Sequence, residues 1–387
     1  MEPLVAAEDI LTRYFDGKVQ LEVDAHLPSS DRTHVLRCRV SRGTSAAPAS
    51  VILKQSVLAY GSTFDGAVDG NVWDEWAGLR FIGKVAPDVA IPYCYGGDTT
   101  LGLIILEDLG NQTTLKDLLI GVDAEAAKQG LFDYSSMLGK LHARTYQQER
   151  TFNEMRSTIG PYEQQHGFYQ HQFRQLGQRF QAMTQALQIS PRQGALRDLE
   201  VVRASLQHPG PFSVYCHGDL TPSNIFVDRT TATLIDFEYG CCGHALLDGV
   251  NARMLFPSGG PFYDLPRSII QQMEAVYRTT LATGCPAAHD EHLWQQAMVV
   301  ACAYWTITLS VWLPFATLLE RDQKWGNATM RQRAIVRSER FAEITELTGY
   351  GEALGATFHM LAARMRALWP EATDVLSMYP AFQSSVD

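Results

Sequence analysis

Three side chains able to bind protons and metal ions lie within the stretch from Cys216 to Gly240, CHGDLTPSNIFVDRTTATLIDFEYG. Asp219 stands five residues before Asn224, and a second carboxylate, Asp236, ends the apolar run that follows. The pattern predicts a strand, a polar loop and then a hairpin. A loop with Asp and Asn beside a hairpin that ends in Asp is typical of phosphoryl transfer, in which one group meets the hydroxyl nucleophile and two hold magnesium.

The composition is that of a globular protein long enough for two lobes. Of its 387 residues, 46% are hydrophobic and 19% are charged, which argues against disorder. The formal net charge of −10 argues against a nucleic-acid partner, which needs a basic face, and favours cationic or neutral ligands. The seven cysteines include no C-x-x-C pair, so we expect a reduced, cytoplasmic protein rather than a disulfide framework or a zinc site.

One uncharged stretch, residues 297–319, is long enough to cross a bilayer. It contains Thr and Ser residues and a Pro near its end, and it lacks the basic flank that orients a single span. We therefore predict a buried helix in a helical lobe and no membrane partner. The N-terminus lacks the basic start and apolar core of a signal peptide, which gives the same expectation of a cytoplasmic protein.

A lysine and a glutamate upstream form a second candidate group. Lys54 interrupts the apolar strand predicted over Ser50–Ser56, and Glu75 lies in the first turns of a helix about twenty residues later. Taken singly, Lys54 would be a snorkelling edge residue and Glu75 a surface carboxylate. Taken together, they fit a strand lysine held by a helix glutamate, the pair that directs an ammonium group at nucleotide phosphates.

The predicted elements change from strands to helices along the chain. After a short helix, the strands are expected over residues 18–23, 34–40, 50–56 and 101–106. A polar hinge follows at residues 107–110. The later chain is predicted to be almost wholly helical, with a helical arm over 150–210 and helices over 265–282, 289–319, 329–348 and 354–368. Strands first and helices after predict an α+β fold in two parts.

With these parts placed, the sequence resembles the aminoglycoside phosphotransferase and choline kinase family of small-molecule kinases. The combination of H-G-D-x-x-P-x-N with a following I-D-F is specific to this pattern. The resemblance spans residues 54–248, and it is carried by Lys54, Glu75, LEDL at 106–109, LGKLHA at 138–143, HGDLTPSN at 217–224, IDFEYG at 235–240 and Asp248.

The resemblance implies a two-lobed, protein-kinase-like fold. Residues 1–109 would form a small β-rich lobe that binds the nucleotide, with the hinge at 107–110. Residues 111–387 would form a large, mainly helical lobe with the catalytic loop at 217–224, the metal-binding segment at 235–240 and the substrate-binding helices. Backbone groups near Glu107 and Leu109 would meet the adenine edge.

The resemblance also implies an activity, the ATP-dependent transfer of a γ-phosphate to a hydroxyl of a small molecule. Asp219 would be the base that orients the hydroxyl, and Asn224 and Asp236 would hold Mg²⁺. Lys54, supported by Glu75, would contact the phosphates of ATP, or of GTP, which the sequence does not exclude. Asp248 would brace the catalytic loop through backbone hydrogen bonds, and His217 would be a structural member of that loop.

Two regions depart from the family pattern or extend it. Residues 25–35, AHLPSSDRTHV, lack the glycines that often cover the phosphates, so Ser29, Ser30 or Thr33 would take that role. The acceptor would be met by Glu238 and Tyr239, because DFEY matches choline kinases. An aromatic helix adds the candidates Trp305 and Trp312, which would either cage a quaternary ammonium or pack in the core.

Two other functions stay open at this point. A catalytically idle kinase-like module would bind a ligand or partner without turnover, although the presence of Lys54, Asp219, Asn224 and Asp236 argues against a degenerate site. A metallophosphoesterase would need a G-N-H cluster, which does not occur. A protein substrate is disfavoured because no A-P-E-like segment follows Asp236. An amino alcohol, an aminoglycoside, a sugar or a natural product all fit as acceptor, and the oligomeric state is left open.

Overall fold

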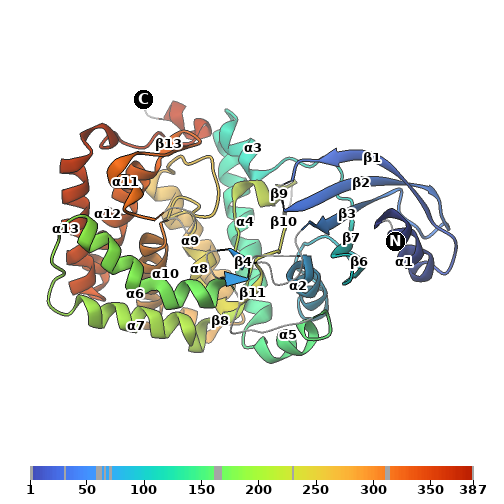
Figure 1. Ribbon diagram of the computed structural model, residues 1–387, viewed down its shortest axis with the longest axis horizontal. Helices are drawn as coiled ribbons and strands as arrows, with labels where there is room; N and C mark the ends of the chain where they lie inside the picture. Colours follow the sequence, from blue (N-terminus) through green and yellow to red (C-terminus); the bar gives the residue numbers. More distant parts are fainter. Residues whose placement is uncertain are drawn as a thin grey trace.

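A five-stranded antiparallel sheet forms the N-terminal part of the molecule, blue to teal at the right of Figure 1. Helices α1 (Pro3–Tyr14) and α2 (Val72–Val85) pack against it. The strands lie in the order β1 (Gln20–Leu27), β2 (Thr33–Arg42), β3 (Ser50–Ser56), β7 (Leu103–Glu107) and β6 (Cys94–Asp98). The computed structural model describes residues 3–29, 32–57, 63–64, 67–68, 72–160, 168–228, 231–309 and 314–385.

Strand β3 lies in the middle of this sheet, between β2 and β7. Successive strand residues point to opposite faces, and β3 is buried on both. Val51 and Leu53 join the apolar cluster under α1. Ile52 packs against the larger core on the other side, so the same alternation turns Lys54 toward α2.

The predicted strands agree with the structure to different degrees. The strand predicted over Ser50–Ser56 is confirmed. Strand β1 continues past the predicted end at residue 23 because its backbone stays paired as far as Leu27, and β2 continues past residue 40 because Arg42 pairs with Gln20. The alternation of apolar and polar residues in the sequence covers only part of the paired length of β1 and β2.

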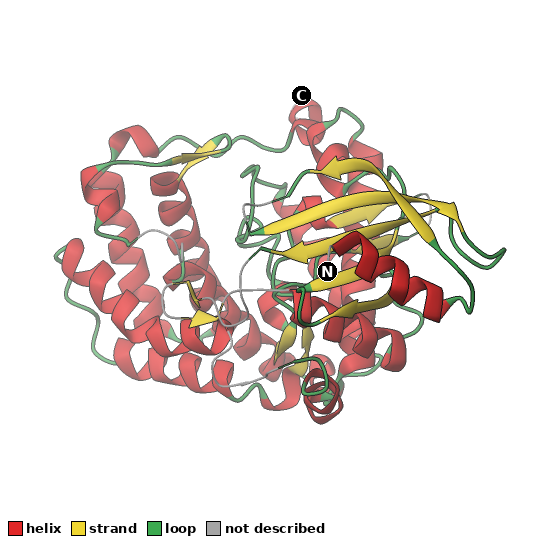
Figure 2. Ribbon diagram, turned by 45° about the vertical axis from the view of Figure 1, so that its right-hand side comes forward, coloured by secondary structure: helices red, strands yellow, loops and turns green. Residues whose placement is uncertain are grey.

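Helices make up most of the chain after β7, and Figure 2 shows them gathered on one side of the sheet. This arrangement confirms the predicted α+β, kinase-like class. The helices are α3 (Leu115–Ile120), α4 (Ala124–Thr145), α5 (Glu149–Arg156), α6 (Phe168–Ala186), α7 (Ala195–Gln207), α8 (Leu246–Gly249), α9 (Arg267–Leu281), α10 (Glu291–Ile307), α11 (Thr317–Glu320), α12 (Met330–Thr348) and α13 (Glu352–Leu368).

Helix α10 is the buried core helix that the uncharged stretch predicted. Every residue from Ala297 to Ile307 is buried. Its predicted end at residue 319 was wrong, because Thr308 leaves helical dihedral angles (φ −91°, ψ 43°) and the next described helix is the short α11. Among the described helices, none combines the length and the apolar character that crossing a bilayer requires.

Short strands form the remaining ribbons, and two of these ribbons carry the candidate site. Strand β8 pairs with β11, and β9 pairs with β10, so the predicted strand, loop and hairpin after Ser213 are confirmed. The bounds are Ser213–Cys216 (β8), Ile225–Val227 (β9), Ala232–Leu234 (β10), Cys241–His244 (β11), Thr63–Phe64 (β4), Ala67–Val68 (β5), Lys324–Trp325 (β12) and Ala328–Thr329 (β13).

Candidate active site

The Lys54 ammonium group lies among three carboxylates. Lys54 is only 7% exposed, and its Nζ is 2.6 Å from Glu75 Oε2, in contact with Asp236 Oδ1, and 3.6 Å from Glu238 Oε2. Burial by itself lowers the pKa of Lys54, but the attraction of Asp236, Glu75 and Glu238 raises that pKa well above its usual value. The ammonium is therefore charged at neutral pH.

The position of each partner follows from its element. Lys54 projects from β3 toward α2, and Glu75 lies in the first turn of α2. Burial raises the pKa of Glu75 to about 7, against the opposing effect of Lys54. The structure thus brings together the lysine and glutamate that the sequence paired, and it adds two carboxylates from the segment after β10.

Asp236 reaches Lys54 through an unusual backbone conformation. Its φ of 69° lies in the left-handed region, which Asp tolerates better than most residues do. The side chain is partly exposed, and the pKa of Asp236 is lowered because the nearby Lys54 outweighs the effect of burial. Asp236 is thus a carboxylate that is ionised and accessible from solvent.

The loop from His217 to Asn224 packs tightly against the segment after β10. Gly218 has a φ of 84°, and a Cβ there would lie 2.5 Å from the carbonyl oxygen of Tyr239. Ile235 donates its N–H to the Asn224 carbonyl at 3.1 Å. This close approach requires glycine at position 218, and it holds the two polar segments side by side.

Asp219 and Asn224 lie together in this loop. The Asn224 Nδ2 donates to the Asp219 backbone carbonyl at 2.9 Å, which leaves the amide oxygen of Asn224 as the atom for a metal ion. Burial raises the pKa of the Asp219 carboxyl to about 7, and repulsion by Asp236 adds to this effect. The carboxyl group therefore loses its proton near neutral pH.

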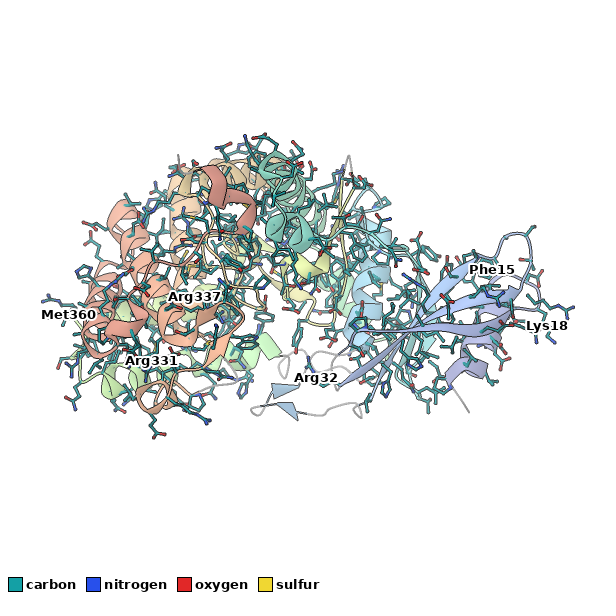
Figure 3. All side chains as sticks on the ribbon, turned by 90° about the horizontal axis from the view of Figure 1, so that it is seen from above. Phe15, Lys18, Arg32, Arg331, Arg337 and Met360 are labelled. Atoms are coloured by element: carbon teal, nitrogen blue, oxygen red, sulfur yellow. The ribbon has the colours of Figure 1, made fainter. Side chains whose placement is uncertain are left out.

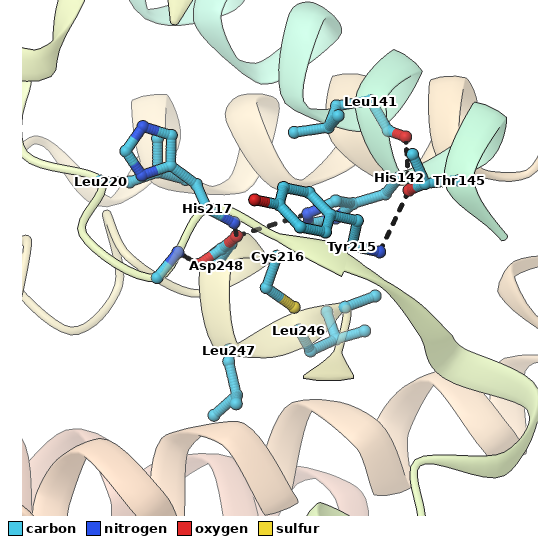
Figure 4. Close-up of polar contacts among 12 residues, drawn as sticks. Leu141, His142, Thr145, Tyr215, Cys216, His217, Leu220, Leu246, Leu247 and Asp248 are labelled. Carbon is cyan, nitrogen blue, oxygen red and sulfur yellow. Dashed lines mark hydrogen bonds and ion pairs between the residues drawn. The ribbon is translucent and has the colours of Figure 1, made fainter. Parts of the chain in front are cut away.

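Asp248 holds the backbone of this loop from behind, as Figure 4 shows. Its Oδ2 accepts the N–H of His217 at 2.7 Å, and its Oδ1 accepts the N–H of Gly218 at 3.3 Å. His142, buried on α4, places its Nε2 3.4 Å from the same carboxylate and its Nδ1 2.8 Å from the Tyr277 hydroxyl.

The same residues have the composition of a metal site, since ligand atoms of His142, Cys216 and Asp248 lie within 4.8 Å of one another. However, both oxygens of Asp248 already accept backbone N–H groups. We therefore interpret these three residues as a support for the backbone of the loop and not as a metal site.

His217 is bonded on both ring nitrogens. Its Nε2 lies 2.8 Å from the Ile235 carbonyl oxygen, and its Nδ1 accepts the Asp219 N–H at 3.3 Å. An Nδ1 that accepts is unprotonated, so Nε2 carries the hydrogen and the ring is neutral. Burial lowers the pKa of His217, which favours the same neutral form. These bonds are those of a structural residue.

The oxygen atoms in the site suit Mg²⁺. Magnesium prefers carboxylate and amide oxygens over nitrogen or sulfur. Asp236 and Asn224 offer such oxygens beside each other, and the repulsion between Asp236 and Asp219 is what a divalent cation would relieve. The residues present therefore fit the metal ion that the family resemblance implies.

The other predicted nucleotide contacts lie around the connection between β1 and β2 and at the hinge after β7. Ser29 is exposed, Thr33 is buried at the start of β2, and Ser30 lies outside the described residues. At the hinge, Glu107 Oε2 accepts the N–H of Tyr93 at 3.0 Å, and the Leu109 carbonyl accepts the Gln112 side chain at 2.9 Å.

A cavity of about 160 Å³ opens beside Asp219. Its lining includes six aromatic residues, Tyr169, Tyr239, Phe262, Tyr304, Trp305 and Trp325, and Ser258, Arg32 and Arg333 also line it. Trp305 donates its Nε1–H to the Leu247 carbonyl at 2.8 Å, so it is both a core residue and a wall of the cavity. Trp312 lies outside the described residues.

The predicted acceptor residues Glu238 and Tyr239 take different positions. Tyr239 lines the cavity, whereas Glu238 lies between Arg32, at 3.5 Å, and Lys54, at 3.6 Å. Arg32 also donates to the Tyr239 hydroxyl at 2.8 Å. Figure 3 shows Arg32 at the junction of the sheet and the helical part.

Sequence reasoning missed the two arginines of the cavity. Arg32 lies in the glycine-free stretch 25–35, between the hydroxyl residues Ser30 and Thr33. A cation at this place in the sequence could have indicated a residue that faces the site. Arg333 had no such signal, because it lies in a helix far from every motif and reaches the cavity only through tertiary packing.

Comparison with known proteins places these features in a family. A sequence profile described as the phosphotransferase enzyme family (APH) matches residues 79–278. The chain belongs to this family and is a small-molecule kinase, which confirms the predicted resemblance and contradicts the metallophosphoesterase alternative. No curated protein sequence matches the chain significantly.

Several solved structures are similar to the chain at low sequence identity. A choline/ethanolamine kinase family protein from Mesorhizobium loti is 16% identical, with a TM-score of 0.45 over 89% of this chain and 94% of that one. A putative aminoglycoside phosphotransferase from Ralstonia eutropha is 12% identical, with a TM-score of 0.49 over 93% and 98%. Choline kinase LicA from Streptococcus pneumoniae is 14% identical, with a TM-score of 0.42 over 88% and 99%.

Proposed function

We propose that this kinase transfers the γ-phosphate of ATP to a hydroxyl group of a small molecule bound in the cavity beside Asp219. The observation that carries the proposal is that Lys54 contacts Asp236, Asn224 is bonded to Asp219, and Asp219 lines that cavity. These residues come from the sheet, the hairpin and the loop between β8 and β9. They offer a cation for phosphate oxygens, two oxygen ligands for Mg²⁺ and a carboxylate for a hydroxyl.

Phosphoryl transfer asks the protein mainly to align the reactants and to balance charge. Asp219 accepts a hydrogen bond from the acceptor hydroxyl and takes its proton as the phosphoryl group moves. A pKa of about 7 suits this work, because the group is ionised for part of the time near neutral pH and still basic enough to receive a proton.

Lys54 binds phosphate oxygens of the nucleotide, and Glu75 holds it in place. Asn224 and Asp236 would hold Mg²⁺, which would supply positive charge against the negative charge that develops on the phosphates. The nearby Lys54 leaves Asp236 ionised, as metal binding requires. Asp248 fixes the loop that carries Asp219.

The variant Asp219→Asn tests this assignment. We expect turnover, measured as coupled ADP release with an active acceptor, to fall by a factor on the order of 10² to 10⁴. Thermal stabilisation by ATP and Mg²⁺ should persist, because Asp219 is not a nucleotide ligand. Asp374→Asn, a change at an exposed position near the C-terminal end of the chain, is the matched control. Near-normal turnover of Asp219→Asn would refute the role of Asp219.

The idle-module alternative makes a different prediction for the wild-type protein. Such a module would be stabilised by ATP and Mg²⁺ but would release no ADP with any hydroxylated acceptor, and its slow ATP hydrolysis would not respond to Asp219→Asn.

A further inference from the structure

Arg333 is a buried cation in the wall of the acceptor cavity. It lies near the start of α12, is 1% exposed, and lines the same cavity as Asp219. The aromatic side chains that line the cavity with them carry no charge. Any acceptor that fills the cavity therefore meets a guanidinium group as well as the carboxylate of Asp219.

The contacts of Arg333 leave much of its donor capacity unused. Its Nη2 donates to the Pro257 carbonyl at 3.1 Å, and its Nη1 has only the weak acceptor Met330 Sδ at 3.4 Å. The guanidinium carbon lies 3.5 Å from the centroid of the Phe262 ring. Its Nε has no hydrogen-bond partner, and in the described part of the chain no carboxylate lies within ion-pair distance of Arg333.

Neighbouring arginines of the helical part are paired instead. Arg331 lies 2.7 Å from Glu371, and Arg253 lies 2.7 Å from Glu274. Arg337, one turn after Arg333, is also buried without a carboxylate, but it donates to the carbonyls of Met254, Trp305 and Leu309 and does not line the cavity. Arg333 alone among these four combines an incomplete set of acceptors with a place in the cavity wall.

A buried guanidinium without an anion is unfavourable in the unliganded protein. Removal from water costs several kcal/mol for an ion unless a counter-charge compensates. Burial is also what lowers the pKa of Arg333 to about 9. A carboxylate presents two oxygens that match the planar donor groups of arginine, and such charge-assisted pairs are the strong ones. The site thus suits an anion, and the described residues do not supply one.

We propose that Arg333 binds a carboxylate of the acceptor, and that the acceptor is a small hydroxy acid with an apolar or aromatic body. This inference rests on the proposed function, since it places the acceptor's hydroxyl at Asp219 and its carboxylate at Arg333, with the carbon skeleton between Tyr304, Trp305 and Phe262. Arg32, the other cation of the cavity, is already paired with Glu238.

An acceptor that carries a carboxylate differs from the cationic or neutral ligand that the composition favoured. The net charge of −10 favoured a cationic or neutral ligand, and the aromatic helix suggested a cage for a quaternary ammonium. The negative charge is spread over the whole chain, whereas the cavity places a buried guanidinium where a bound ammonium group would meet like charge.

The first experiment compares acceptors that differ only in charge. The wild-type protein is assayed for coupled ADP release with 3-phenyllactate and a panel of smaller hydroxy acids, with the methyl ester of each acid, with the matching amino alcohols, and with glycerol 3-phosphate. We expect at least one hydroxy acid to be used with kcat/KM at least 100-fold above that of its ester. A preference for glycerol 3-phosphate would reassign the anion as a phosphate, and a preference for amino alcohols or esters would overturn the inference.

The second experiment removes the guanidinium. In Arg333→Met, KM for the preferred acid should rise at least 30-fold while KM for its ester stays within threefold, and Arg333→Lys should recover part of the loss. The melting temperature of the unliganded Arg333→Met protein should stay equal or rise, because no ion pair is broken; a purely structural arginine predicts a fall. Equal losses for acid and ester would also refute the role of Arg333.

The controls separate failure of this inference from failure of the proposed function. Arg364→Met, at an exposed position of α13, should keep the wild-type preference. If the wild type is neither stabilised by ATP and Mg²⁺ nor active on any compound, the proposed function itself fails. If it phosphorylates neutral or cationic acceptors and Arg333→Met makes no difference, only the assignment of the hydroxy acid fails.

Discussion

Ionisation of the Asp219 carboxyl group destabilises the unliganded protein. Burial and the neighbouring Asp236 raise its pKa to about 7, whereas an Asp in the unfolded chain titrates near 4. Ionisation is therefore less favourable in the folded state. The resulting penalty is absent well below pH 4, grows between pH 4 and pH 7, and is complete above pH 7.

Asp219→Asn should for this reason stabilise the unliganded protein while it lowers turnover. We expect a gain on the order of 1–3 kcal/mol at pH 8 and a smaller gain at pH 5, since asparagine carries no charge at either pH. Urea unfolding at the two pH values measures both. Asp374→Asn, which is exposed, should change neither. A gain that does not depend on pH would show that ionisation of Asp219 is not its cause.

At the scale of elements, the short loop after β8 depends on a residue from outside it. Bonds within the loop link Asp219, Thr221 and Asn224, and Asp248, just before the end of α8, accepts the N–H groups of His217 and Gly218. The backbone of the loop from His217 to Asn224 is thus fixed by α8 and, through His142, by α4.

Asp248→Asn should weaken this support without touching a substrate. The amide offers one acceptor oxygen in place of two, so one backbone N–H loses its buried partner, at a cost of about 2 kcal/mol. We expect kcat to fall by at least tenfold while KM for ATP changes less than threefold. Urea unfolding and steady-state kinetics measure the two effects. Wild-type stability together with wild-type kcat would contradict the assignment.

The elements that the sequence predicted well are those with a local signal. The strand Ser50–Ser56 is bounded by polar residues, and the hairpin after Asn224 has short apolar runs around a polar turn. The end of α10 had no such signal, because the uncharged residues continue past Ile307. Arg333 could not be predicted for another reason, since tertiary packing alone brings it into the same cavity wall as Asp219.

The polar part of the site was predictable mainly through the family motifs. Lys54 and Glu75 suggested a pair by their types, but the contact of Lys54 with Asp236, 182 residues away in the chain, follows from the motif and not from any local pattern. The roles of Asp219 and Asp248 remain predictions, which the variants Asp219→Asn and Asp248→Asn test.

At the scale of the whole molecule, Lys54 ties the sheet to the helical part. It comes from β3 and contacts Asp236 and Glu238, which belong to the segment after β10. Glu75 completes the group from α2. Removal of the ammonium would leave three carboxylates close together with no cation between them.

Lys54→Met should therefore destabilise the protein in a way that depends on pH. We expect a loss of about 3 kcal/mol at pH 8, because uncompensated buried charges are costly. The loss should be smaller at pH 5, where protonation relieves the repulsion; the pKa of Glu75, already about 7, would rise further. Thermal unfolding at both pH values measures this. Lys84→Met, at an exposed position of α2, is the control, and an equal loss at both pH values would contradict the explanation.

The contacts of Arg32 have a thermodynamic consequence for the two substrates. Arg32 lines the acceptor cavity and contacts Glu238, Glu238 contacts Lys54, and Lys54 contacts Asp236. A ligand that neutralises one member of this series changes the charge that the others experience. Nucleotide and acceptor affinities are therefore linked, and by reciprocity each ligand changes the dissociation constant of the other by the same factor.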